Sequence, residues 1–113
     1  MRRGEIWLIN LDPTIGAEIK KTRPVVIVSS DEVGILPLRV IVPLTDWKPR
    51  YVESPWMVQV TPDDQNGLLK PSACDAFQVR SVSVDRFSRK VGSLSARTLR
   101  LLTLALAEVL EIE

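Results

Sequence analysis

The sequence predicts a single, mainly β domain, a small β-barrel or strongly curved sheet, followed by one C-terminal helix. Three observations predict this fold class. The chain has 113 residues, of which 45% are apolar and 26% charged, which suits one globular domain over residues 1–113. Its first two-thirds consists of short β-branched runs separated by turn residues. The last segment changes to the apolar spacing of a helix, so the strands come first and the helix closes the domain.

Turn residues bound each expected strand. The first strand ends at Asp12-Pro13-Thr14-Ile15-Gly16, where proline fixes φ and glycine permits a positive φ. The continuous apolar run that begins at Val25 is typical of a strand buried on both faces. The expected strands span Glu5–Leu11, Val25–Ser29, Leu38–Leu44, Trp56–Val60 and Ala73–Val84.

The last segment is expected to form a helix that begins after Ser95, a suitable N-cap residue. Apolar residues then recur at steps of three and four, namely Leu99, Leu102, Leu106 and Val109. This stripe is widened by Leu101, Leu104, Ala105 and Leu110. The stripe taken alone is more typical of an ordinary core helix, but its width leads us to expect contact with a second subunit as well as with the sheet.

Composition excludes several classes of site. The formal net charge is +1, so any nucleic-acid site must be a local patch. One cysteine and no histidine exclude an internal disulfide, a Cys/His zinc site and imidazole catalysis. The acidic pairs Asp31-Glu32 and Asp63-Asp64 adjoin turn residues, so no metal and no other cofactor is expected. No apolar run approaches 18 residues, and residues 1–30 lack a signal-peptide core, so we expect a soluble, cytoplasmic protein without a membrane partner.

The charged loop Glu18–Pro24 contains the strongest candidate for phosphate chemistry, Arg23. RNA carries its own nucleophile, the 2′-hydroxyl, which needs orientation and charge stabilisation. Arginine can provide both, because its planar fork reaches two phosphate oxygens and stays charged. Pro24 favours extended backbone at Arg23, and the buried strand that follows anchors it. On local sequence alone, an exposed arginine before a strand is nevertheless the more common case.

A second candidate is Thr45, which follows the apolar run ending at Leu44, although a hydroxyl at a strand end is often only a turn cap. The next residues interleave aromatic and cationic side chains, namely Trp47, Lys48, Arg50 and Tyr51. Stacking on aromatic rings beside a cationic track is typical of single-strand recognition. A small surface cluster or a protein-binding patch would have the same composition.

Six segments of the chain identify a protein family by their order and spacing, although none of them does so alone. They are Gly4–Trp7, Leu11–Glu18, Arg23–Ser29, Pro43–Thr45, Gly67–Ser72 and Phe77–Val82, and with the terminal helix they cover nearly the whole chain. Together they resemble the MazF/PemK family of toxin endoribonucleases. The resemblance implies an SH3-like barrel of the CcdB/PemK type that forms a homodimer, with RNA bound in a groove across the dimer interface.

The resemblance also implies an activity and a partner. It implies an mRNA interferase that cuts single-stranded RNA at a short sequence without a metal, leaving a 2′,3′-cyclic phosphate (or 3′-phosphate) and a 5′-hydroxyl. The usual partner is a MazE-like antitoxin whose acidic, disordered tail occupies the RNA groove. The family's arginine falls on Arg23, for phosphate stabilisation and proton donation, and its threonine on Thr45, for positioning the scissile phosphate. The acidic loop position falls on Glu18, whose role stays open. The expected RNA contacts are Lys20, Lys21, Trp47, Lys48, Arg50, Tyr51 and Gln78.

The chain departs from the family pattern after Thr45. Relatives often have polar residues and then Tyr-Pro, whereas this chain has Asp46–Val52, so the cleavage sequence does not follow from the resemblance. Cys74 and Asp75 also stand where relatives often have apolar residues. One alternative function is a CcdB-like gyrase poison, but those relatives end in a tryptophan-containing tail and this chain ends in Val109–Glu113. The other is a barrel that binds RNA or protein without catalysis, against which the presence of Arg23 and Thr45 argues.

Overall fold

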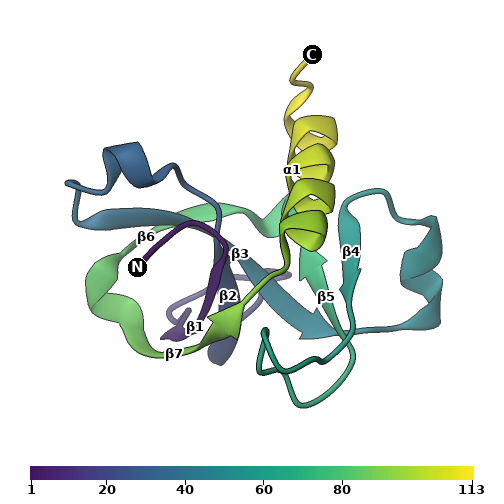
Figure 1. Ribbon diagram of the computed structural model, residues 1–113, viewed down its shortest axis with the longest axis horizontal. Helices are drawn as coiled ribbons and strands as arrows, with labels where there is room; N and C mark the ends of the chain where they lie inside the picture. The colour runs from purple at the N-terminus through teal and green to yellow at the C-terminus, as the bar shows by residue number, and fades with distance from the viewer.

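The computed structural model describes residues 1–113 as seven antiparallel strands and a C-terminal helix (Figure 1). The order along the sheet is β4-β5-β3-β2-β1-β7, and β6 pairs with β3 off this path. The strands are β1 (Glu5–Asn10), β2 (Thr22–Ile27), β3 (Leu38–Asp46), β4 (Met57–Val60), β5 (Ser72–Asp75), β6 (Arg80–Ser83) and β7 (Phe87–Ser93), and the helix is α1 (Ala96–Leu110). The predicted class, mainly β with one closing helix, is confirmed.

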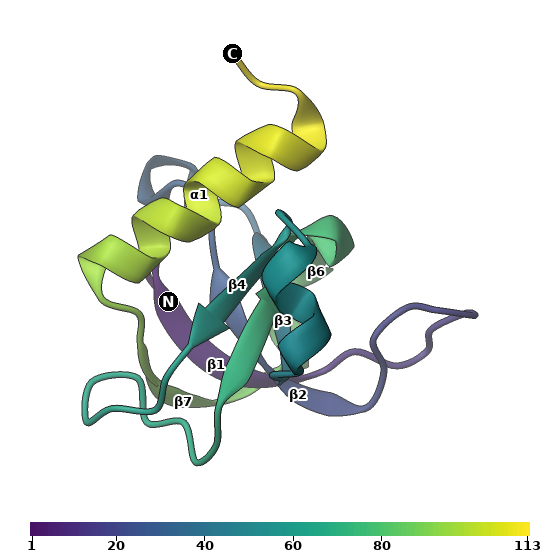
Figure 2. The ribbon, with the colours of Figure 1, turned by 90° about the vertical axis from the view of Figure 1, so that its right-hand side faces the viewer.

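Strand β3 gives the sheet its curvature. Its residues Leu38–Ile41 pair with β6, Ile41–Pro43 pair with β2, and Leu44–Asp46 pair with β5. Different parts of this nine-residue strand pair with different neighbouring strands. The sheet therefore bends along β3, and its two parts face each other around the core (Figure 2). The end strands β4 and β7 do not pair with each other, so the sheet is strongly curved but not closed into a barrel.

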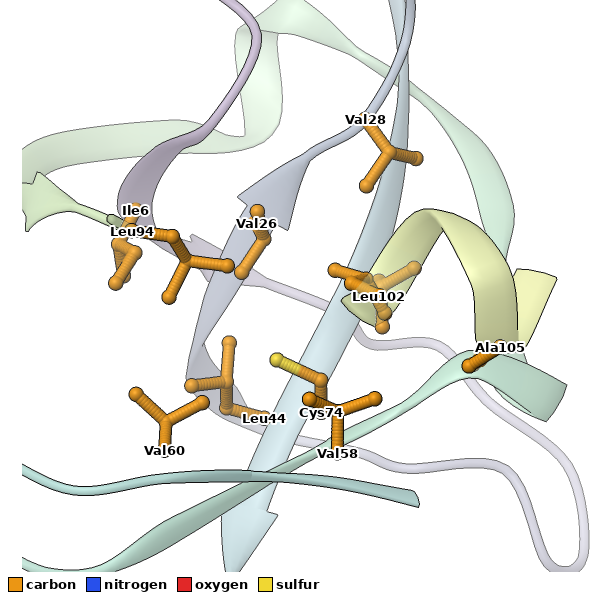
Figure 3. Packing of buried hydrophobic residues seen from close by; sticks show 12 residues of the cluster. Ile6, Val26, Val28, Leu44, Val58, Val60, Cys74, Leu94, Leu102 and Ala105 are labelled. Atoms are coloured by element: carbon orange, nitrogen blue, oxygen red, sulfur yellow. The ribbon is translucent and has the colours of Figure 1, made fainter. Parts of the chain in front are cut away.

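The main core lies between the curved sheet and α1. Leu102 and Ala105 of the helix are buried among side chains from several strands, including Val26, Leu44 and Cys74 (Figure 3). A second buried cluster on the other face of β2 contains Val25 and Ile27. The prediction that this strand is buried on both faces is therefore confirmed.

Cys74 is fully buried in the main core, as expected for a cysteine that acts as a small apolar residue. Burial raises the pKa of its thiol to about 12, because the low-dielectric interior disfavours the thiolate. A buried thiol with a raised pKa is less reactive than an exposed one.

The helix begins as the sequence predicts. Ser95 is the N-cap, and its Oγ accepts a hydrogen bond from the Thr98 backbone N–H at 3.1 Å. The helix ends where Glu111 adopts the left-handed conformation, with φ of 54°. The residues that widen the apolar stripe divide between the two sides of the helix: Ala105 is buried, whereas Leu101, Leu104 and Leu110 are exposed.

The sequence-based prediction of one long strand at Ala73–Val84 is wrong. The chain breaks there into β5, a short 3-10 helix (η3, Ala76–Gln78) and β6. The cause is Asp75, whose carboxylate accepts a hydrogen bond from the Phe77 N–H at 3.1 Å and so begins η3. The pKa of Asp75 is raised, because the effect of burial is larger than the opposing effect of the hydrogen bonds from Phe77 and Gln78.

Strand β7 was not predicted from the sequence. This strand pairs only with β1, and its exposed residues Ser88, Arg89 and Lys90 interrupt any apolar alternation. No helix in the structure combines the length and the apolar character that a membrane span requires.

Candidate active site

Arg23 and Thr45 lie at the same hollow of about 230 Å³, on the neighbouring strands β2 and β3. The register explains their proximity: Val25 pairs with Pro43, and two more residues along the same antiparallel register would place Arg23 opposite Thr45. The hollow is lined by Thr22, Arg23, Pro24, Leu44, Thr45, Asp46, Lys70 and Ser72. The structure thus brings together the two residues that the sequence singled out, which stand 22 positions apart in the chain.

Arg23 is held by its own loop and by the sheet. Its Nε donates a hydrogen bond to the Lys20 carbonyl at 3.3 Å, and its backbone pairs with Ile9 of β1. The side chain is partly buried, and its terminal nitrogens make no hydrogen bond or ion pair within the chain. An anchored guanidinium with its two outer nitrogens free is suited to bind an anion.

Asp46 lies among three cations at the edge of this hollow. Its carboxylate forms an ion pair with Lys70 Nζ at 2.9 Å. The hydrogen bond from Lys70 is the main cause that lowers the pKa of Asp46, and the charges of Lys70, Arg23 and Lys48 lower it further. One carboxylate against three cations leaves the hollow locally positive, although the net charge of the whole chain is only +1.

Glu18 does not share this hollow. It lines a neighbouring one of about 470 Å³, together with Ile19, Pro43, Phe77 and Gln78 among others. Its Oε1 accepts a hydrogen bond from the Ile15 N–H at 2.8 Å, and the residue is exposed. The structure therefore places the acidic candidate in the loop beside Arg23 and Thr45, in a separate cavity.

Gln78 connects η3 to the loop between β1 and β2. Its Oε1 accepts from the Ile19 N–H at 2.6 Å, and its Nε2 donates to the Ala17 carbonyl at 3.1 Å. Both ends of the amide thus hold the loop that carries Glu18. An RNA contact by Gln78 stays a prediction, and its observed partners give it a positioning role.

The other expected RNA contacts are exposed or partly exposed. Lys20 and Lys21 are in the β1–β2 loop, which projects from the body of the molecule (Figure 2). Trp47 and Tyr51 meet edge to face with ring centroids 5.8 Å apart, and the Arg50 guanidinium lies 5.3 Å from the centre of the Tyr51 ring. Trp47, Arg50 and Tyr51 therefore contact one another at the surface, and their contact with RNA stays a prediction.

Sequence reasoning missed three residues at these hollows. Lys70 and Ser72 reach the Arg23 hollow because β5 pairs with β3, where Asp46 lies opposite Ser72. Phe77 is 67% exposed beside Gln78, and its ring meets that of Trp56 edge to face. Only the family resemblance of the segments 67–72 and 77–82 pointed to this region, because no local pattern predicts which strands pair. No group of three or more His, Cys, Asp or Glu side chains in the structure could hold a metal ion.

Comparison with known proteins gives a family for this chain. A family model described as the PemK-like, MazF-like toxin of type II toxin–antitoxin systems matches residues 2–110. Endoribonuclease MazF9 of Mycobacterium tuberculosis is 34% identical over 112 residues, which cover 94% of this chain and 92% of the relative. Endoribonuclease PemK of Escherichia coli is 52% identical over 46 residues, 40% of this chain and 35% of that protein.

Solved structures share the fold. MazF from Deinococcus radiodurans is similar with a TM-score of 0.81 and 21% identity, covering 99% of this chain and 97% of that one. A mycobacterial endoribonuclease in complex with its cognate antitoxin gives a TM-score of 0.78 at 21% identity, covering 100% of this chain and 97% of that one. The solved structures show that the fold is shared, and the sequence matches show which family the chain belongs to. The chain belongs to the family of PemK-like and MazF-like toxins of type II toxin–antitoxin systems.

Proposed function

We propose that this protein is an endoribonuclease toxin that cuts single-stranded RNA, including mRNA, at a short sequence without a metal ion. The observation that carries the proposal is the hollow shared by Arg23 and Thr45 in a chain that matches endoribonucleases. A guanidinium with free outer nitrogens and a hydroxyl residue line one small cavity, and such donors can stabilise charge developing on a phosphate.

The proposed reaction is an internal transfer on the RNA. The 2′-oxygen forms a bond to the adjacent phosphorus and loses its proton, and the bond from phosphorus to the 5′-oxygen breaks. The leaving 5′-oxygen takes up a proton, which gives a 2′,3′-cyclic phosphate (or, after hydrolysis, a 3′-phosphate) and a 5′-hydroxyl. Arg23 stabilises the charge on the phosphate oxygens and supplies a proton toward the leaving oxygen, while Thr45 positions the scissile phosphate. Glu18 is the acidic residue of the adjoining loop, and because it lines a separate cavity its role in the reaction stays open.

Two partners belong to the proposal. The first is a second copy of this chain, because α1 and β4 border an exposed hollow of about 520 Å³ lined by Met57, Leu101, Leu104 and neighbouring residues. The second is an antitoxin with an acidic tail. A related mycobacterial endoribonuclease has been solved with its cognate antitoxin, and the cations around Asp46 would attract acidic side chains.

The test is incubation of the purified protein with mixed-sequence single-stranded RNA in EDTA. We expect discrete cuts whose upstream fragments end in a cyclic phosphate or 3′-phosphate and whose downstream fragments begin with a 5′-hydroxyl. A strand with a 2′-deoxy sugar at the mapped cut site should stay intact, since it lacks the nucleophile. Intact RNA under all conditions would overturn the proposal, and cleavage of the 2′-deoxy strand would overturn its mechanism.

A further inference from the structure

A third hollow, of about 360 Å³, adjoins the Arg23 hollow on the β1–β7 side of the molecule. The two hollows share Pro24, Lys70 and Ser72, so they lie next to each other. The remaining lining consists of Leu8, Gly67, Leu68, Leu69, Arg89 and Val91. We propose that this hollow binds the nucleotide next to the scissile phosphate, with Arg89 on the flanking phosphate. The inference rests on the proposed RNA cleavage and extends it to a new subsite.

The charge and polarity of the hollow fit a nucleotide. Arg89 is exposed on β7, opposite Leu8 of β1, and its side chain forms no ion pair or hydrogen bond within the chain. Lys70 stands between the two hollows, so Arg23, Lys70 and Arg89 mark a cationic path along them. Leucine and proline side chains line the rest, and Leu69 is 98% exposed. A cationic path beside apolar surface suits a single strand, whose phosphates bind the cations and whose base lies on the apolar residues.

The wall of the hollow is rigidly built. The connection between β4 and β5 lies against β7, where the Ser93 N–H donates to the Gln65 carbonyl at 3.0 Å. Asn66 is only 2% exposed and satisfies its side chain through the Thr61 carbonyl and the N–H groups of Asp63 and Leu68. These bonds fix the segment that presents Leu68–Lys70, so the hollow exists before any ligand arrives.

Two glycines make this close packing possible. Gly67 has φ of +67°, and a Cβ there would collide with the Val91 carbonyl oxygen. A Cβ on Gly92 would meet the backbone of Gln65 and Asn66. The β4–β5 connection can lie directly on β7 only because both positions lack a side chain.

The position next to the Arg23 hollow favours RNA over a peptide as the occupant. A strand whose phosphate lies at Arg23 must continue on both sides of it, and this hollow shares three lining residues with the Arg23 hollow. An acidic peptide is the competing occupant, and the experiment separates the two.

The experiment compares Arg89→Ala, Arg89→Lys and the control Arg100→Ala, which removes the same charge from an exposed site on α1. The first readout is kcat and KM on a short RNA that carries a mapped cut site. The second is the affinity, as a function of salt, of a 2′-O-methyl version of the same strand, which cannot be cut. For Arg89→Ala we expect a KM about 5- to 20-fold higher with kcat nearly unchanged, because one charge-assisted contact is lost. The slope of log affinity against log salt should fall by about 0.7, as for one phosphate contact on a single strand. Arg89→Lys should retain the slope.

A methylphosphonate at each phosphate in turn locates the contact. Neutralising the phosphate beside the cut should weaken wild-type binding and have little further effect in Arg89→Ala. Equal KM, affinity and salt slope for Arg89→Ala and Arg100→Ala would overturn the inference. So would an Arg89→Ala variant that binds RNA normally but loses affinity for a poly-glutamate peptide. If the proposed function itself is wrong, the wild-type protein will leave every RNA intact. The binding of the 2′-O-methyl strand to the wild type and the variants can still be compared in that case.

Discussion

Asp46 is the one carboxylate among the cations of the Arg23 hollow. Its ion pair with Lys70 is solvent-exposed, so it contributes little to stability. In the proposed complex with RNA, Asp46 would repel phosphate and compete with it for Lys70. We therefore expect this residue to limit the affinity of the site for RNA.

The variant Asp46→Asn should bind RNA more tightly. We expect a KM about 3-fold lower, with a steeper dependence on salt, because Lys70 becomes free to contact phosphate. The measurement is KM at low and physiological salt, and Asp64→Asn, an exposed acidic residue outside the hollows, is the matched control. A KM that rises in Asp46→Asn would mean that the carboxylate helps to bind the substrate.

Glu5 has a strongly lowered pKa, which links its ionisation to the stability of the fold. Its carboxylate accepts hydrogen bonds from Trp7 Nε1 and the Arg2 N–H, both at 3.0 Å, and pairs with Lys90 at 3.1 Å. Burial raises the pKa of Glu5, but these partners outweigh burial and lower it from 4.5 to about 2. A carboxylate with a depressed pKa stabilises the folded state above its unfolded pKa, and that contribution is lost as the pH falls through the folded pKa.

The pH dependence of unfolding tests this assignment. The fall in pKa corresponds to about 3 kcal/mol, present above pH about 5 and lost progressively toward pH about 2. We expect the difference in unfolding free energy between the wild type and Glu5→Gln, measured in urea, to shrink by that amount over this range. A difference that stays constant between these two pH values would contradict it.

The β1–β2 loop is the element that joins the two hollows nearest the proposed chemistry. It carries Glu18 in one hollow and leads into Arg23 at the other, and it is tied to η3 mainly by Gln78. Its position therefore depends on a side chain 59 residues from Ile19 in the chain.

Removing this tie should loosen the loop without unfolding the domain. In Gln78→Ala we expect exchange of the Ile19 amide hydrogen to become about 10-fold faster, since one net hydrogen bond is lost. The KM for RNA should rise as well. Gln65→Ala is the matched control for the exchange measurement, because it removes amide hydrogen bonds to Ser93 and Leu94 and none to the β1–β2 loop. Unchanged exchange at Ile19 in Gln78→Ala would contradict the positioning role.

Local signals predicted the elements with strong patterns. The run around Val25–Val28 predicted β2, and the N-cap Ser95 with its apolar spacing predicted α1. The break at Asp75 was missed because its capping hydrogen bond competes with strand formation, and strand β7 was missed because an exposed edge strand has no apolar alternation.

The residues of the candidate site also divide into those that a local sequence pattern predicts and those that it does not. Arg23 and Thr45 could be named from their places at strand ends, and the family resemblance singled out the same two residues. Lys70 and Arg89 could not be named, because they reach the hollows through β5–β3 and β7–β1 pairing, and no local pattern encodes which strands pair.

On the surface of the whole molecule, the apolar outer side of α1 has no partner within the chain. Leu104 is 61% exposed on α1, and together with Leu101 it borders the hollow between the helix and β4. Side chains of this kind at a hydrophobic hollow are typical of an interface between copies. The proposed dimer therefore uses the outward side of the same helix whose inner side closes the core.

Replacing Leu104 by a carboxylate should separate the subunits. We expect Leu104→Asp to fold normally but to associate about 100-fold more weakly or worse, because a charge would be buried without a partner. Light scattering over a range of concentrations measures the mass. Ile35→Asp, at a 95% exposed apolar residue in the β2–β3 connection, is the control and should remain dimeric. A Leu104→Asp variant that stays dimeric would place the interface elsewhere.

The most direct test of the account is the single-turnover rate of RNA cleavage in EDTA by the wild type and Arg23→Ala. If a fixed guanidinium stabilises the phosphate as the 2′-hydroxyl attacks, the variant should be about 100- to 1000-fold slower with an unchanged unfolding midpoint. Arg23→Lys should fall between the two, because it keeps the charge but loses the planar fork. Cleavage by folded Arg23→Ala at the wild-type rate would contradict the account.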